Sequence, residues 1–132
     1  MLTLYKSLDC WRFADALFLD IHQLTKAFPP DERFVLTTQL RRAALSVPTN
    51  IVEGNARFHG RERLQYLRTA LSSLAETEYL LSVAFRLSYI PSERMPGLES
   101  LSAQAAAALR GLIAKVASAS PDARDTFDRK RR

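Results

Sequence analysis

The stretch Gln39-Leu40-Arg41-Arg42-Ala43-Ala44-Leu45-Ser46-Val47-Pro48-Thr49-Asn50-Ile51-Val52-Glu53-Gly54 decides the fold, because it marks three separate faces of one helix. At about 100° per residue, one face is apolar. That face carries Leu36, Leu40, Ala43, Ala44, Val47 and Ile51. A polar stripe beside it carries Arg42, Ser46, Asn50, Glu53 and Arg57. Leu45 and Val52 lie on a third side, so the helix is expected to have more than one neighbour.

Pro48 lies in the middle of this helix. Proline has no N–H for the carbonyl of the residue four positions earlier, here Ala44, and its ring crowds that turn. The sequence therefore predicts a kink at Pro48. Ser46 or Asn50 is a candidate donor to the carbonyl that the proline leaves free.

The composition indicates an all-helical domain. The chain has 132 residues, enough for one domain with its own core, and 47% of them are hydrophobic against 25% charged. There are only four glycines and six prolines, and the prolines fall mainly where helices should start, end or bend. Many of the remaining residues are alanine and leucine.

Four amphipathic segments follow one another. The first starts at Ser7 or Asp9 and must end by Phe28, because Pro29-Pro30 disfavours the helical conformation before each ring. The second is expected to be capped by Asp31 and to reach about Ala56; the third covers about 61–88, and the fourth starts at 92–93, or restarts at Pro96, and ends at 118. The sequence therefore predicts an all-α, antiparallel up-down four-helix bundle over residues 1–118 with a Pro-kinked second helix, followed by a mobile charged tail over 119–132.

An acidic residue interrupts the apolar stripe of the third segment. That stripe contains Leu64, Leu67, Leu71, Leu74, Leu81 and Phe85, and Glu78 falls among them. A carboxylate among leucines needs a cationic or hydrogen-bonding partner. We expect a structural polar network between the second and third helices, made of Arg42, Ser46, Asn50, Glu53 and Glu78.

Some apolar residues lie outside the core stripes. They are Leu45 and Val52 on the second helix and Leu80, Val83 and Leu87 on the third. A monomer would leave them in water, so these five are predicted to form a subunit interface in a closed homo-oligomer.

The chain has a net charge of +5, and most of its basic residues are arginines that cluster in the sequence. Clustered arginine is typical of proteins that bind phosphate groups. The candidate nucleic-acid-binding residues are Arg41, Arg57, Arg61, Arg63 and Arg68 with Arg129, Lys130, Arg131 and Arg132 of the tail. The alternative is a solvated helix face with internal ion pairs.

Little in the sequence supports a metal site or a catalytic site. His22 is expected to be a packed side chain and His59 a surface loop residue, and neither has metal ligands at the right spacing. Cys10 has no partner for an internal disulfide and no histidine at local spacing, although thiol chemistry stays open. No metal, cofactor or catalytic residue is predicted. With no signal peptide or membrane-length apolar run, we expect a cytoplasmic protein.

Several motifs together resemble a known family. They are Phe28-Pro29, Glu32-Arg33-Phe34, Gln39-Leu40-Arg41-Arg42-Ala43, the run from Ser46 to Gly54, and Ala70 to Glu78. The chain resembles, from about Leu8 to Val116, the bacterial four-helix bundle family whose genes were first noticed in intervening sequences of the large ribosomal RNA. It is also similar to the accessory variability proteins of diversity-generating retroelements. Val52, where alanine is usual, and Ser72, where glycine is usual, depart from the pattern.

The resemblance implies a bundle that assembles as a ring of five with a basic surface. In the retroelement relatives such rings bind nucleic acid and a reverse transcriptase, so RNA, DNA, a reverse transcriptase or another protein are the implied partners. The expected function is a non-enzymatic, oligomeric scaffold that binds RNA or DNA through its backbone. The alternative is a protein-interaction scaffold that docks a partner on the apolar strips without nucleic acid.

Overall fold

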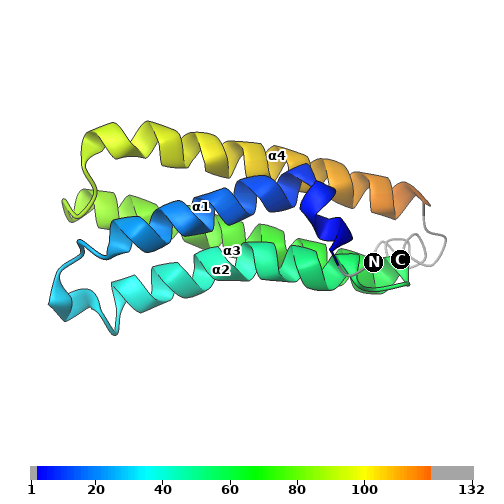
Figure 1. Cartoon of the computed structure of the whole chain (residues 1–132), viewed down its shortest axis with the longest axis horizontal. Coiled ribbons are helices and arrows are strands. Elements are labelled where there is room, and N and C mark those ends of the chain that lie inside the picture. Colours follow the sequence, from blue (N-terminus) through cyan, green and yellow to red (C-terminus); the bar gives the residue numbers. More distant parts are fainter. Residues whose placement is uncertain (1–2, 120–132) are drawn as a thin grey trace, which may run out of the picture.

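Four long helices joined by short turns make up the computed structural model, which describes residues 3–119. They are α1 (Asp9–Thr25), α2 (Leu36–Asn55), α3 (Gly60–Arg86) and α4 (Met95–Ala119), with short 3-10 helices at Leu4–Ser7, Pro30–Glu32 and Ser92–Arg94. Each helix packs against its neighbours in a closed order, α1 with α2, α2 with α3, α3 with α4 and α4 with α1. Successive helices run in opposite directions along the bundle (Figure 1). The predicted up-down four-helix bundle is confirmed; residues 120–132, which hold nearly all of the predicted tail, lie outside the described residues.

The core is built from one apolar stripe of each helix. The six residues predicted for the α2 stripe are all buried. In α1, Cys10 and Leu17 are buried, whereas Trp11 and Phe18 are only partly buried. Either pair of residues fits a helical repeat, and the packing of α1 against α2 and α4 decides which pair is buried.

The approach of α2 to α3 is closest at Gly54. A Cβ atom at this position would lie 3.0 Å from the Cβ of Tyr66 and 3.4 Å from the carbonyl oxygen of Arg63. Both atoms belong to or adjoin the α3 backbone, so they have little freedom to move aside. Glycine at the end of the quoted stretch is therefore required by helix packing.

Pro48 lies inside α2, and the helix continues on both sides of it. The Thr49 hydroxyl donates to the carbonyl of Leu45 at 2.8 Å, and the Asn50 amide donates to the carbonyl of Ser46 at 2.8 Å. The prediction that Ser46 or Asn50 serves the Ala44 carbonyl is wrong. A side chain in a helix reaches back to the carbonyl four residues earlier, and for Asn50 that residue is Ser46.

The first helix begins at Asp9, one of its two predicted starts, but the predicted cap of the second helix, Asp31, is wrong. Leu8 precedes α1 without a side-chain cap, and Ser7 donates instead to the carbonyl of Leu4. Asp31 lies in the 3-10 helix Pro30–Glu32, and α2 begins only at Leu36. The Glu32 carboxylate accepts from the Leu36 amide at 3.3 Å, so an acid does satisfy the start of α2, but from a different residue.

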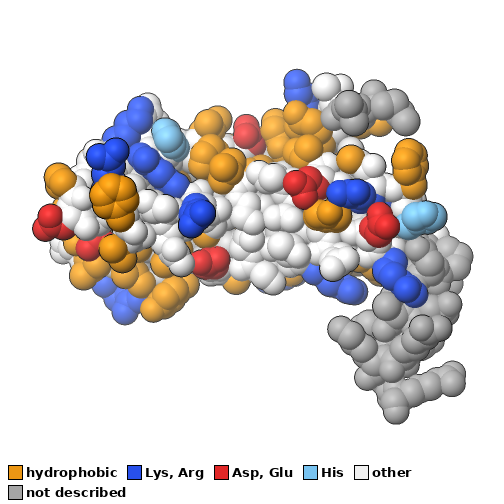
Figure 2. Space-filling model, turned by 90° about the horizontal axis from the view of Figure 1, so that it is seen from below, with side chains coloured by type: hydrophobic (Ala, Val, Ile, Leu, Met, Phe, Trp, Pro, Cys, Tyr) orange, Lys and Arg blue, Asp and Glu red, His pale blue; other side chains and the backbone are white. Residues whose placement is uncertain are grey.

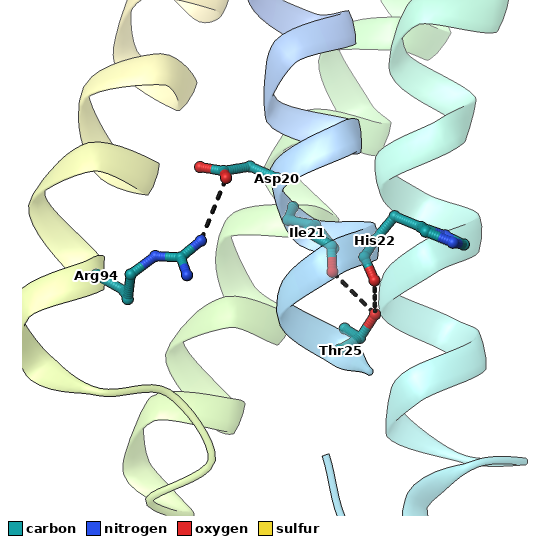
Figure 3. A network of polar contacts seen from close by, with 5 residues as sticks. All are labelled: Asp20, Ile21, His22, Thr25 and Arg94. Atoms are coloured by element: carbon teal, nitrogen blue, oxygen red, sulfur yellow. Dashed lines mark hydrogen bonds and ion pairs between the residues drawn. The ribbon is translucent and has the colours of Figure 1, made fainter. Parts of the chain in front are cut away.

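One end of the bundle is held together by contacts between distant parts of the chain. The Tyr89 ring packs on Phe28 with centroids 5.5 Å apart, and its hydroxyl donates to Glu32 at 3.4 Å. Desolvation and then the Glu32 charge raise the pKa of Tyr89. Figure 3 shows Arg94, just before α4, reaching Asp20 of α1 at 3.2 Å. These contacts tie the α3–α4 connection to α1 and to the α1–α2 connection.

Within residues 3–119 no helix combines the length and the apolar character that crossing a bilayer requires.

Replacing Gly54 tests the close contact between α2 and α3. Gly54→Val is expected to lower the free energy of unfolding by about 1–3 kcal/mol, because the added atoms overpack a tight contact. Gly111→Ala in α4 is the matched control, since nothing lies within 4 Å of the added Cβ. The control should stabilise by about 0.5–1 kcal/mol through helix propensity. Urea unfolding followed by circular dichroism measures both changes, and a neutral Gly54→Val would contradict the packing account.

Cys10 is expected to be chemically inert in the folded protein. It is 2% exposed, and burial raises the pKa of its thiol from 9.0 to about 11. At pH 8 the thiolate fraction should then be about 100-fold smaller than in the unfolded chain. Iodoacetamide labelling followed by mass spectrometry should be slow in buffer and fast in urea, and equal rates would show that the thiol is accessible.

Candidate nucleic-acid interface

The turn between α2 and α3 brings basic and aromatic side chains together at one end of the bundle. Arg57, Phe58, His59 and Arg61 are all exposed there, and Phe58 is 92% exposed. Figure 2 shows Lys and Arg side chains at both ends of the elongated molecule, with fewer of them along its middle. An exposed aromatic ring among arginines offers both a stacking surface and phosphate contacts.

Arg57 is positioned by Tyr66 of α3. Its Nη2 donates to the Tyr66 hydroxyl at 2.8 Å, and its guanidinium carbon lies 4.9 Å from the ring centroid. Tyr66 is the residue whose Cβ approaches Gly54. The same α2–α3 contact that requires glycine therefore also orients the first arginine of the turn.

The remaining α3 arginines differ in exposure. Arg61 and Arg68 are exposed and seven residues apart, so they share one side of the helix. Arg63 is half-buried and borders a small cavity beside Gly54, Leu67 and other apolar side chains. Its Nε is buried and has no hydrogen-bond partner within the described residues. Arg63 is thus part of the packing at the helix junction, whereas Arg61 and Arg68 face solvent.

Arg41 belongs to the other end of the bundle. The last residue of α2, Asn55, comes 14 residues after Arg41, which at about 1.5 Å per residue is about 21 Å of helix. The Arg41 Nε donates to the Thr25 hydroxyl at 2.7 Å and its Nη2 to the His22 carbonyl at 3.3 Å. The Thr25 hydroxyl also lies within 3.0 Å of the carbonyl oxygens of Ile21 and His22 (Figure 3). The arginines predicted as one set therefore form no single patch, and Arg129, Lys130, Arg131 and Arg132 lie outside the described residues.

Only part of the predicted polar network exists. The hydroxyls of Ser46 and Ser73 are 2.8 Å apart across the α2–α3 contact, and the Asn50 amide donates to Ser46 Oγ at 2.9 Å. Arg42 and Glu53 are exposed, and neither forms an ion pair with another described residue. For these two residues the predicted network is wrong.

Glu78 is exposed and accepts a hydrogen bond from Ser102 of α4 at 2.5 Å, so its partner is not on α2. Thr77 takes the buried position of the α3 stripe and donates to the Ser73 carbonyl at 2.8 Å. Positions 77 and 78 both fit the helical repeat. The buried one is the residue that can satisfy its own polar group within the helix.

The predicted interface residues are exposed to different degrees. Leu45 and Leu87 are 47% and 50% exposed, and Val52 is half-buried. Leu80 and Val83 pack partly against the core of their own subunit. Among the apolar side chains outside the predicted interface, Phe34 at 84% and Val35 at 67% are more exposed than these. These two lie just before α2, where helical periodicity gives no signal.

The histidines have the roles expected of ordinary side chains. His22 is half-buried with its ring 6.0 Å from that of Phe18, and His59 is exposed at the start of α3. Among residues 3–119 no three His, Cys, Asp or Glu side chains come together as metal ligands.

The chain is similar to proteins of one family. The model of the 23S rRNA-intervening sequence protein matches residues 6–111. A solved structure from Bacteroides thetaiotaomicron, described as a protein with unknown function from the S23 ribosomal protein family, is 25% identical with a TM-score of 0.72. The match covers 79% of this chain and 97% of that one. No curated protein matches significantly. Since the family model spans most of the helical bundle, the chain belongs to the 23S rRNA-intervening sequence protein family.

Proposed function

We propose that the protein is a non-enzymatic, oligomeric scaffold that binds the backbone of RNA or DNA through the α2–α3 turn and the first turns of α3. The observation that carries this is the exposed group of Arg57, Phe58, Arg61 and Arg68. Arginine forms bidentate contacts with phosphate, and an exposed ring stacks on an unpaired base. Neither contact reads a base sequence, so the expected binding is structure- or charge-selective.

The proposal includes a closed homo-oligomer, with a ring of five as the expected form. Repeating a modest patch around a ring converts later contacts into intramolecular ones and raises affinity without a larger site on each subunit. The exposed Leu45 and Leu87 supply apolar surface for such an assembly.

The side chains that most resemble catalytic groups serve the fold in our proposal. Ser46, Ser73 and Asn50 bond to one another across α2 and α3 and include no general base. Cys10 is buried and protonated at neutral pH. These environments favour a binding role over a catalytic one.

Removing the turn arginines tests the phosphate contacts. Arg57→Ala, Arg61→Ala and Arg68→Ala together should remove three phosphate contacts per subunit and weaken binding to a labelled structured RNA. Three such contacts account for roughly a 20- to 40-fold loss of affinity between 50 and 200 mM salt. Fluorescence anisotropy at both salt concentrations measures the affinity and its salt slope, with duplex DNA as the second ligand.

A charge-matched control replaces Arg42, Arg86 and Arg110, which are exposed elsewhere on the bundle. This control should keep most of the affinity if the turn is the site. If the two triple variants lose RNA affinity equally, binding depends on net charge in general and not on a local site. Salt-independent binding by the wild type would rule out the phosphate account.

Leu45→Glu tests the subunit interface. If Leu45 lies between subunits, a buried carboxylate should dissociate the oligomer, which light scattering reports as a lower mass. Leu19→Glu is the control, because Leu19 is 56% exposed on α1 and outside the predicted interface. An unchanged mass for Leu45→Glu would contradict the interface and favour the alternative, in which this surface docks another protein.

A further inference from the structure

A polar pocket lies at the opposite end of the bundle from the α2–α3 turn. It has a volume of about 250 Å³ and is bordered by the end of α1, the α1–α2 connection and the first turns of α2. At about 30 Å³ per water molecule this is room for about eight waters, which suits a small ligand. Three of its lining residues are Lys26, Arg33 and Arg41, and none is acidic.

Thr37 supplies the observation that points to a ligand. It lines the pocket, is only 7% exposed, and its hydroxyl has no hydrogen-bond partner among the described residues. Other threonines of the bundle, Thr49, Thr69 and Thr77, donate to the carbonyl four residues earlier in their own helices. For Thr37 that residue is Arg33, which lies before α2 begins, and this bond is not formed. A buried hydroxyl left without a partner is costly, so an acceptor in the pocket would stabilise it.

The positive groups around Thr37 are arranged for an anion. Arg41 uses two of its five N–H donors on Thr25 and His22, which holds its guanidinium in place and leaves other donors available. The first turn of α2 contributes its partial positive charge. Asp31 and Glu32 lie in the same connection but do not line the pocket, and the Glu32 carboxylate accepts hydrogen bonds from the Leu36 amide and the Tyr89 hydroxyl.

We propose that this pocket binds the phosphate group of a small phosphate monoester, held by Thr37, Arg41, Arg33 and Lys26. A phosphate oxygen accepts from the Thr37 hydroxyl, and the cations balance its charge. Phe28, Pro29 and Pro30 also line the pocket and offer an apolar surface to the organic part of the ligand. A free monoester and the terminal phosphate of a nucleic-acid strand share this chemistry. The site is separate from the α2–α3 turn and does not depend on the function proposed for that turn.

The test compares wild type with Thr37→Val, which keeps the side-chain shape and removes the hydroxyl. Without ligand, Thr37→Val should unfold at a higher temperature, because it no longer buries an unpaired polar group. With inorganic phosphate, the wild type should gain thermal stability over a potassium chloride control of equal ionic strength. Phosphate affinity, measured by calorimetry, should fall about tenfold in Thr37→Val and in Arg33→Gln. Thr69→Val and Arg86→Gln are the matched controls and should bind as wild type does.

Two further comparisons separate the sources of the phosphate and the two sites. A nucleoside 5′-monophosphate should bind and the nucleoside should not; a 5′-phosphorylated oligonucleotide should gain affinity over its 5′-hydroxyl form only if strand ends enter the pocket. The Arg57, Arg61 and Arg68 triple variant should keep its phosphate affinity, so failure of either site is recognised independently. If wild type and Thr37→Val bind phosphate equally, or if the wild type binds none, the proposed phosphate site is wrong.

Discussion

The contact between α2 and α3 at Gly54 is the constraint on which the rest of the structure depends. A Cβ there would lie 3.0 Å from the Tyr66 Cβ, and about two turns further along the two helices the hydroxyls of Ser46 and Ser73 are 2.8 Å apart. A close backbone approach and a short polar contact together define the register of the two helices. The register in turn places Tyr66 beside Arg57 and keeps the turn between the helices short. The close packing of α2 against α3 therefore also positions Arg57 of the candidate nucleic-acid surface.

The two ends of the bundle carry positive charge for different reasons. At the α2–α3 turn, the arginines are exposed near an aromatic ring, and Tyr66 positions Arg57. At the α1–α2 end, Arg41 is held against the end of α1 and borders a solvent-open pocket, and Thr37 in its lining has a buried hydroxyl without a hydrogen-bond partner among the described residues. A row of exposed cations suits an extended polyanion, whereas a preorganised pocket suits one small anion. The adjacent residues Arg41 and Arg42 show the same division, since one is half-buried and hydrogen-bonded and the other is exposed.

Charge and hydrophobic pattern in the sequence were good guides to position but poor guides to partners. The α2 stripe and the four helices were predicted correctly, because a helical repeat determines which residues share a face. The Arg42, Glu53 and Glu78 network failed, because the same repeat allows either Thr77 or Glu78 to face inward and Glu78 is bonded to α4. Asp31 failed as a cap because the Pro29-Pro30 connection continues as a 3-10 turn before α2 begins. The partner of a polar side chain depends on which neighbouring helix it meets, and a sequence pattern carries no such information.

By itself, the sequence determined the class of the protein: four amphipathic helices of these lengths, separated by prolines and short turns, bury their apolar faces most simply as an up-down bundle. It also determined where arginine is concentrated, and the motif from Gln39 to Gly54 marked the family. The tertiary structure alone decided that Arg63 is packed while Arg61 and Arg68 are exposed, and that Lys26, Arg33, Thr37 and Arg41 share a pocket. The physical reason is that helical periodicity assigns a residue to a face of its own helix, while the rotation and register of packed helices decide which of those faces meet.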